Sequence, residues 1–309
     1  GLASGPYGLG VRVPLVVISP WSKGGWVNSQ VFDHTSLIQF VERRFGITEP
    51  NITPWRRAVA GDLTSAFNFA EPNAATVPLP STVAFAPPDN KRHPDYVPAP
   101  PAEQVMPQQE RGTRPARAVP YELHADASVD FAGGAVTLSF RNTGSGTAVF
   151  QVRSGNSSDA PRSYTVEPNA KLSDTWALGS EGLSAYDLSV YGPNGFFRRF
   201  AGSLTGSNVA ALTLEVQYDH AGDGVHLLIH NAGKTTTELT ITDAYTKQKV
   251  TRSVHGPGEF AGRWELRESF GWYDLAIEAD TDPHFRWQVA GHVETGKDSV
   301  TDPAIGAAV

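Results

Sequence analysis

The second half of the sequence repeats itself, and this repeat constrains the fold more than any other feature. Four pairs of segments match at an offset of 87 to 89 residues: Val136–Gly144 with Val225–Gly233, Leu172–Leu178 with Phe260–Leu266, Ala185–Val190 with Trp272–Ile277, and Phe200–Gly202 with Val289–Gly291. Each copy consists of short alternating apolar and polar stretches separated by Gly, Asn and Pro, a pattern typical of strands joined by turns. The repeat predicts two tandem all-β sandwich-like domains, at residues 121–210 and 211–300, with a tail at 301–309.

Residues 1–71 have a different pattern, which favours α/β structure. The nearly continuous β-branched run Val11–Pro20 is typical of a strand buried on both faces. Residues 33–46 predict a helix, because apolar residues recur at helical spacing between an Asp that can cap its start and a Gly that can end it. A second, shorter helix is expected from Asp62 to Phe69.

One strand and two helices cannot close a hydrophobic core, because a strand with two buried faces needs neighbouring strands on both sides. Residues 1–71 are therefore expected to be the last segment of a larger α/β catalytic domain whose earlier part lies on another polypeptide. The alternative is that they pack in an unusual way against the downstream β domains.

Residues 72–120 form a proline-rich connector in this interpretation. They contain 12 of the 23 prolines and show no apolar periodicity, so we expect an extended segment that runs across neighbouring domains. Phe85 and Tyr96 are its expected anchors.

Composition narrows the classes of function. The formal net charge of -7 and the isoelectric point near 5.7 argue against a partner nucleic acid, because neutralising phosphates requires a basic face. The chain has no cysteine, so it contains no disulfide and no thiolate metal site. Its apolar stretches are too short to span a bilayer and its first residues lack the pattern of a signal peptide, so we expect a soluble chain or the mature remainder of a longer one.

The residues most able to support chemistry follow the predicted strand, where α/β sheets bind ligands. His34 is expected at a helix N-terminus, where it could ligate a metal, position a phosphoryl oxygen or protonate a leaving group. The competing interpretation is that it caps the helix or packs under the loop. Thr35 and Ser36 are interpreted as caps, since no partner base is identifiable.

Trp21 and Trp26 flank a Gly pair and could form an aromatic wall for a quaternary ammonium group or an acyl chain. Ordinary loop packing is the alternative.

In the repeats, several histidines are scattered without a metal-binding pattern and are expected at the surface: His220, His226, His230, His284 and His292. Four aromatic residues there could form a lipid or sugar surface, although core positions are favoured for most: Tyr191, Trp272, Tyr273 and Trp287.

The chain resembles the C-terminal portion of bacterial phosphocholine-preferring phospholipases C. The segments that carry the resemblance occur in this order: Val11–Trp26, Val31–Gly46, Asn51–Arg57, Gly61–Phe67, the proline-rich connector and the β repeats. These enzymes belong to the phosphoesterase group that includes certain acid phosphatases. The resemblance covers essentially the whole chain. It implies a mixed fold, in which the end of an alkaline-phosphatase-like α/β domain is followed by two tandem β domains.

The resemblance also implies a function. The family splits phosphatidylcholine, and often sphingomyelin, into a lipid alcohol and phosphocholine at a membrane surface, and its members are secreted or periplasmic. The nucleophile and the ligands of a divalent metal ion are expected on an N-terminal polypeptide of the same enzyme, since their motifs do not occur in this chain. His34 is the implied catalytic residue, and Trp21, Trp26 and Asp33 are the implied substrate-binding residues. A lipid- or glycan-binding β module and an acid phosphatase remain as alternatives.

Overall fold

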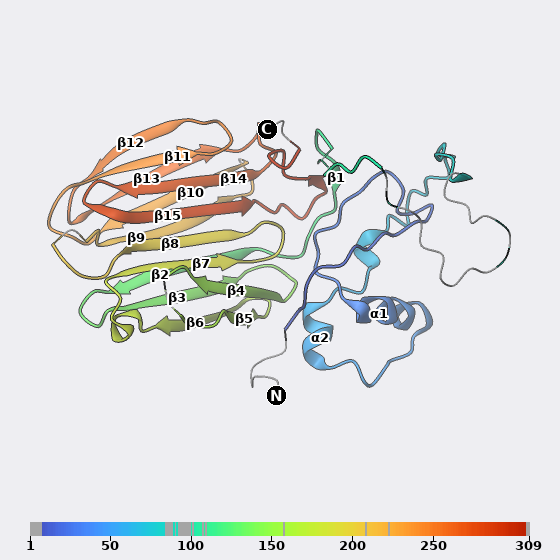
Figure 1. Cartoon of the computed structure of the whole chain (residues 1–309), viewed down its shortest axis with the longest axis horizontal. Coiled ribbons are helices and arrows are strands. Elements are labelled where there is room, and N and C mark those ends of the chain that lie inside the picture. Colours follow the sequence, from blue (N-terminus) through green and yellow to red (C-terminus); the bar gives the residue numbers. More distant parts are fainter. Residues whose placement is uncertain are drawn as a thin grey trace.

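The computed structural model describes residues 8–83, 89, 91, 100, 102–106, 108, 110–156, 158–207, 209–221 and 223–306. A large β body, formed by the two repeats, lies beside a small helical segment that precedes it in the sequence (Figure 1). The proposed connector anchors Phe85 and Tyr96 lie outside the described residues.

Both repeats have the same order of strands. Repeat 1 contains β2 (Leu123–Asp130), β3 (Ala135–Asn142), β4 (Ala148–Ser154), β5 (Arg162–Val166), β6 (Ala170–Trp176), β7 (Ala185–Tyr191) and β8 (Phe197–Ser203), with a 3-10 turn, η3 (Leu178–Glu181), before β7. Repeat 2 contains β9 (Leu212–Asp219), β10 (Gly224–Asn231), β11 (Thr237–Asp243), β12 (Lys249–Val254), β13 (Gly258–Glu265), β14 (Trp272–Ala279) and β15 (Asp282–His292). The internal repeat of the sequence is thus also a repeat of structure.

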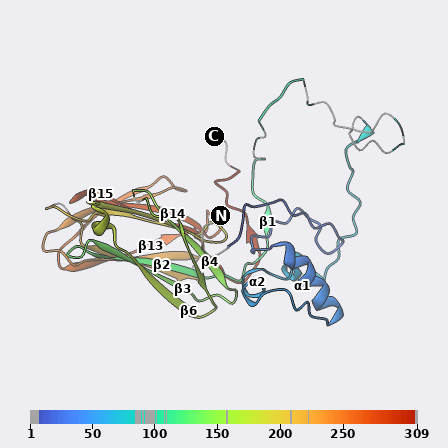
Figure 2. The ribbon, with the colours of Figure 1, turned by 60° about the horizontal axis from the view of Figure 1, so that its bottom comes forward.

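The two repeats share one continuous sheet instead of forming two separate sandwiches. The last strand of repeat 1, β8, pairs antiparallel with the last strand of repeat 2, β15, which creates an eight-stranded sheet in the order β12-β11-β14-β15-β8-β7-β4-β5. Two three-stranded sheets, β2-β3-β6 and β13-β10-β9, form the second layer (Figure 2). The sequence predicted the β class and the repeat, but not this merging, because pairing between β8 and β15 depends on contacts about 90 residues apart.

Alternating side chains of both layers build one hydrophobic core that runs through both repeats. Residues from each repeat are fully buried in it, among them Phe140, Phe200, Leu227 and Trp287. Trp176 is also fully buried, whereas its repeat counterpart Trp264 is only partly buried against the same core. Their positions correspond, since Trp176 pairs with Val136 and Trp264 pairs with Val225.

The helical segment contains α1 (His34–Phe45), α2 (Pro54–Val59) and a 3-10 turn, η1 (Thr64–Ala66). The predicted helix over residues 33–46 is confirmed, with Asp33 as the N-cap and Gly46 as a left-handed C-cap. The predicted helix from Asp62 to Phe69 is wrong. The Asp62 side chain accepts a hydrogen bond from the Thr64 amide and Leu63 has a φ of 65°, so the chain forms only the short turn η1. Helix α2, which begins at a Thr-Pro pair, was missed because its six residues carry too little periodicity.

The prediction of a buried strand at Val11–Pro20 is wrong for this chain by itself. The structure assigns no strand within these residues, and Val11, Val16 and Ile18 are largely exposed. The physical reason is that the described part of the chain offers no neighbouring strand with which this run could pair. Most of the apolar residues that recur at helical spacing in α1 are exposed as well, namely Leu37, Ile38, Val41 and Phe45. Phe40 is half-buried and stacks on Phe67, with ring centroids 5.1 Å apart.

The helical segment contacts the β body through a short strand, β1, which lies within the predicted connector. β1 (Pro115–Ala116) pairs with β16 (Ser299–Val300) near the C-terminus, and Val27 forms a parallel bridge to Ala116. The Val31 amide donates to the Tyr121 hydroxyl at 3.0 Å, and the Trp55 indole donates to the Thr165 hydroxyl at 3.0 Å. The end of the proline-rich region is therefore an integral part of the contact between the two parts of the molecule.

Candidate functional site

The start of helix α1 is fixed by a reciprocal capping arrangement. The Asp33 carboxylate accepts hydrogen bonds from the amide and the hydroxyl of Thr35, at 2.7 and 2.6 Å, and the Ser36 hydroxyl accepts from the Asp33 amide at 3.0 Å. This pairing is a capping box and satisfies amide groups that the first helical turn leaves free. Thr35 and Ser36 therefore have the capping roles that were predicted for them.

Asp33 also connects α1 to α2. Its second carboxylate oxygen lies 2.5 Å from the Arg56 guanidinium. Burial opposes ionisation of Asp33, but the hydrogen bonds from Thr35 and the ion pair with Arg56 outweigh burial and lower its pKa. Asp33 is thus held as an anion whose interactions are already made within the chain.

His34 is the first residue of α1 and is exposed. Within the described ranges, the imidazole has neither a hydrogen bond nor an ion pair. An accessible imidazole at a helix N-terminus can position an anionic oxygen or transfer a proton. The neighbouring residues of the capping box fix the backbone of His34 while leaving its side chain available.

The buried side of α1 is polar, and it packs on α2. Gln39 donates to the Ala60 carbonyl at 3.3 Å, and the Glu42 carboxylate accepts two hydrogen bonds from the Arg57 guanidinium, at 2.8 and 2.9 Å. The Arg57 hydrogen bonds, together with the amide of Glu49, lower the pKa of Glu42 to about 2. These contacts hold the two helices together and leave the apolar side of α1 facing outward.

The two tryptophans of the Gly-rich loop lie in different surroundings. Trp21 is exposed and packs against Phe69, with ring centroids 6.1 Å apart. Trp26 is half-buried, and the Arg117 guanidinium stacks over one face of its indole, 3.8 Å from the ring centroid. The structure therefore does not bring Trp21 and Trp26 together into a single aromatic wall.

A cavity of about 450 Å³ opens beside this loop. Its lining combines apolar residues of the exposed run with polar and aromatic residues of the loop, and it includes Leu15, Ile18, Lys23, Trp26, Phe32 and Arg117. Of the residues predicted for the site, Trp26 lines this cavity, while Trp21, Asp33 and His34 do not. Arg117 was missed by sequence reasoning, because it lies 91 residues beyond Trp26 and has no recognisable motif around it.

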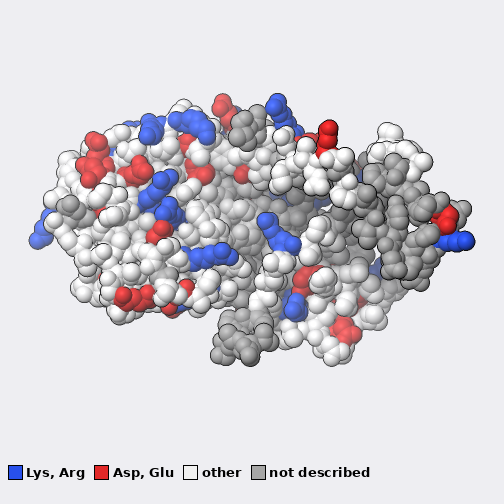
Figure 3. Space-filling view, viewed as in Figure 1, with Lys and Arg blue, Asp and Glu red and all other residues white. Residues whose placement is uncertain are grey.

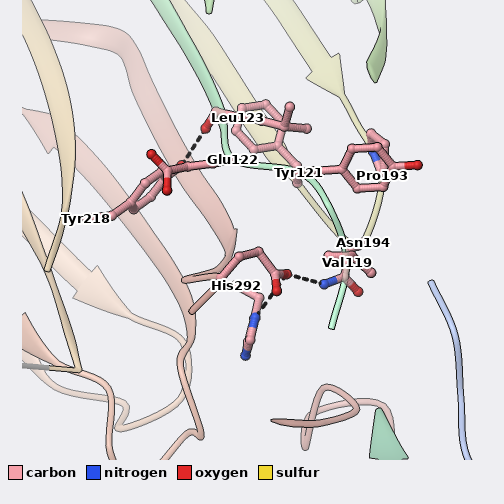
Figure 4. Close-up of a pocket in the computed structure, with 10 residues that line it drawn as sticks. Val119, Tyr121, Glu122, Leu123, Pro193, Asn194, Tyr218 and His292 are labelled. Carbon is pink, nitrogen blue, oxygen red and sulfur yellow. Dashed lines mark hydrogen bonds and ion pairs between the residues drawn. The ribbon is translucent and has the colours of Figure 1, made fainter. Parts of the chain in front are cut away.

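A second cavity, where the two repeats meet, measures only about 20 Å³ and has room for about one water molecule (Figure 4). Its polar groups bind one another: Asn194 donates to Glu294 at 2.6 Å, and Tyr218 donates to the Leu123 carbonyl at 2.6 Å. His292 lies 3.0 Å from Glu294 with only 6% of its side chain exposed, so the expectation that it lies at the surface is wrong. These contacts stabilise the junction of the repeats.

The aromatic residues singled out in the repeats are mostly in the core, as predicted: of the four, Trp272, Tyr273 and Trp287 are buried and Tyr191 is exposed.

Among the residues the structure describes, no group of three or more His, Asp or Glu side chains could hold a metal ion. The described helices include none that is long and apolar enough to cross a membrane. On the described surface in Figure 3, basic and acidic side chains are interspersed, and neither sign forms a continuous patch.

Comparison with known proteins identifies two families along the chain. The family described as "Bacterial phospholipase C, C-terminal domain" matches residues 115–203 and 212–292, one match for each repeat. The family described as "Phosphoesterase family" matches residues 1–48, which include the Gly-rich loop and α1.

Individual relatives match along nearly the whole chain. "Non-hemolytic phospholipase C" of Burkholderia pseudomallei is 49% identical over 312 residues, which cover 99% of this chain and 44% of the relative. "Non-hemolytic phospholipase C" of Pseudomonas aeruginosa is 45% identical, covering 97% of this chain and 44% of that protein. "Hemolytic phospholipase C" of the same organism is 40% identical, covering 98% and 46%. The chain thus spans less than half the length of these relatives, and it belongs to the bacterial phospholipase C family, whose C-terminal domain it contains twice.

Proposed function

We propose that this chain is the C-terminal part of a secreted or periplasmic phospholipase C that hydrolyses phosphatidylcholine to diacylglycerol and phosphocholine. Sphingomyelin, which would yield ceramide, is a second candidate substrate. The proposal is supported by the family membership, and by the relatives, which are named phospholipase C and are more than twice as long as this chain. The nucleophile and the ligands of a divalent metal ion would lie on residues that precede this chain in the complete enzyme.

The observation that carries this proposal is the unpaired apolar surface of the phosphoesterase segment. Val11, Val16 and Ile18 are 93, 77 and 85% exposed in a run whose composition suits a buried strand. Helix α1 presents Leu37 and Phe45 outward in the same segment. Exposed apolar area of this extent on consecutive elements is typical of a surface that another part of the protein covers. We infer that strands of the preceding catalytic domain pair with residues 11–18 and that its other elements pack on α1.

The residues of this chain would then form one wall of the active site. His34, exposed and without a partner in the described chain, would orient or protonate a phosphoryl or leaving-group oxygen. Asp33 would cap α1 and thereby hold the backbone of His34 in place. Trp26, which lines the cavity beside the Gly-rich loop, would contribute the indole face that Arg117 does not cover to a choline headgroup.

Assaying the chain alone and joined to its upstream polypeptide tests this proposal. We expect the chain alone to be inactive on a chromogenic phosphocholine diester, and the joined protein to hydrolyse it. Turnover by the chain alone would show that the nucleophile lies within these residues, and inactivity of the joined protein would contradict the enzyme assignment.

The same preparations distinguish the two alternatives. An acid phosphatase would hydrolyse a phosphomonoester faster than the choline diester. A non-catalytic lipid- or glycan-binding module would co-sediment with phosphatidylcholine vesicles, or be retained on a glycan matrix, while the joined protein remained inactive on both esters.

A further inference from the structure

The Gly-rich loop is held by backbone hydrogen bonds from the β body. The Val27 amide donates to the Pro115 carbonyl at 2.9 Å, and the Arg117 amide donates to the Val27 carbonyl at 2.8 Å. These two bonds form the parallel bridge between Val27 and β1. The loop end that carries Trp26 is therefore fixed to the strand that leads into repeat 1.

The side chain of Arg117 makes the second contact between the same two segments. Its guanidinium lies 3.8 Å from the centroid of the Trp26 ring, and only 8% of the side chain is exposed. One terminal nitrogen lies 3.1 Å from Asp298, while Nε is buried and makes no hydrogen bond within the described chain. The guanidinium is thus held by stacking on the indole and by one carboxylate, an arrangement that needs a planar cation.

Asp298 belongs to the far end of the chain, just after repeat 2. Its other carboxylate oxygen accepts from the Ala118 amide at 3.0 Å, so one side chain holds both the guanidinium of Arg117 and the backbone that follows β1. The next residues form β16, which pairs with β1, and the Val300 carbonyl accepts from the Trp272 indole at 3.0 Å. A continuous set of contacts therefore runs from the core of repeat 2 to the Gly-rich loop.

The two glycines of the loop have backbone conformations that depend on the absence of a side chain. Gly24 and Gly25 have φ values of 122° and 70°, which side-chain-bearing residues rarely adopt, and a Cβ at Gly24 would lie 2.9 Å from the Trp26 indole nitrogen. Two adjacent glycines give the loop many alternative conformations. Hydrogen bonds from the Asn68 amide to Trp21 and within the turn at Ser19 fix the first part of the loop, and the contacts at Val27 and Trp26 fix its end.

We propose that Arg117 and Asp298 are positioning residues, through which the β body fixes Trp26 and the Gly-rich loop at the edge of the substrate site. The part of this inference that concerns substrate rests on the proposed phospholipase C function. It assigns the C-terminal repeats a role in shaping the site, in addition to any contact they make with lipid.

The test compares the full-length enzyme with its Arg117→Ala variant by amide hydrogen exchange and by kinetics. We expect exchange at the backbone amides of residues 27 and 117, which make the two hydrogen bonds of the bridge, to become about tenfold faster or more, because the stacking and the salt bridge no longer limit local opening. For a phosphocholine ester we expect KM to rise about five- to tenfold, with kcat changed less than about twofold, as befits a residue that positions a binding loop.

Arg162 provides a matched control, because its guanidinium lies 3.9 Å from the Trp176 ring centroid and 3.0 Å from Asp174, away from the loop. Arg162→Ala should lower Tm but leave both the loop exchange and KM unchanged. Arg117→Lys keeps the charge beside Asp298 without the planar stack. It should give loop exchange faster than wild type but slower than Arg117→Ala, and it is the variant to test if Arg117→Ala does not fold.

Unchanged loop exchange in the Arg117 variants, or faster exchange with an unchanged KM, would overturn the inference. A wild-type enzyme without activity on the ester would count against the proposed function alone, since the exchange comparison requires no turnover.

Discussion

Arg199 and Gln288 face each other across the pairing of β8 with β15, at the point where an approximate two-fold axis relates the two repeats. Each binds the aspartate of the neighbouring strand of its own repeat: Arg199 contacts Asp187 at 2.8 and 2.9 Å, and Gln288 donates to Asp274 at 2.7 Å. Because the register of this pairing matches the offset of the sequence repeat, exchanging the repeats preserves the register of β8 and β15 at the junction. The β body is therefore a fused pseudo-dimer with one core.

The same pseudo-symmetry places two tyrosines in equivalent but unequal hydrogen bonds. Arg198 donates to the Tyr273 hydroxyl at 2.9 Å, and its repeat counterpart Trp287 donates to the Tyr186 hydroxyl at 3.3 Å. Tyr273→Phe should lower the free energy of unfolding by about 2 kcal/mol, because it removes an acceptor from a buried cation, whereas Tyr186→Phe should cost about 1 kcal/mol or less. Urea unfolding measures both values, and an equal or larger loss for Tyr186→Phe would contradict this account of the junction.

The paired tryptophans of the core should also differ in their contributions. Trp176 is fully buried, while Trp264 is only partly buried. Trp176→Ala should destabilise the protein by about 3 to 5 kcal/mol. Trp264→Ala should cost about half as much, because the Trp264 side chain buries less apolar area when the protein folds. Thermal unfolding compares the two variants, and the prediction fails if the two Tm values fall equally.

The histidine at the seam of β2 and β9 should make stability depend on pH. Burial, with repulsion by Arg141, lowers the pKa of His124 from 6.5 to about 4. The unfolded chain therefore binds a proton between pH 6.5 and 4 that the folded protein does not, and stability should fall as the pH drops through this window. His124→Gln should flatten this part of the curve in urea unfolding at pH 7.5, 6 and 4.5. His230→Gln, which changes an exposed histidine, is the control and should leave the wild-type slope intact.

His34 should matter for turnover more than for folding. In the full-length enzyme, His34→Ala should reduce kcat for a phosphocholine ester by about 10²-fold if the imidazole transfers a proton. His284→Ala, which removes an exposed histidine of repeat 2, should leave kcat unchanged. An unchanged rate for His34→Ala together with a lower Tm would assign His34 to the capping of α1 alone.

Local sequence signals predicted those elements whose stability is local. The helix over residues 33–46 carries its own caps, Asp33 and Gly46, so its boundaries could be read from the chain. The run Val11–Pro20 has an equally clear pattern, but a strand exists only when a neighbour accepts its hydrogen bonds, and the described residues contain none. The composition of this run favours a buried strand, but its conformation depends on whether a neighbouring strand is present.

The sequence by itself determined the repeat, the β class of its two copies, the helix α1 and the position of His34 at its start, because each depends on residues close together in the chain. Only the tertiary structure decided that the repeats merge through β8 and β15, that the polar side of α1 is the buried one, and that Arg117 stacks on Trp26 beside Asp298. These features join residues from 15 to about 180 positions apart, and the choice among such partners is made by packing and desolvation of the folded whole, for which no short stretch of sequence carries a signal.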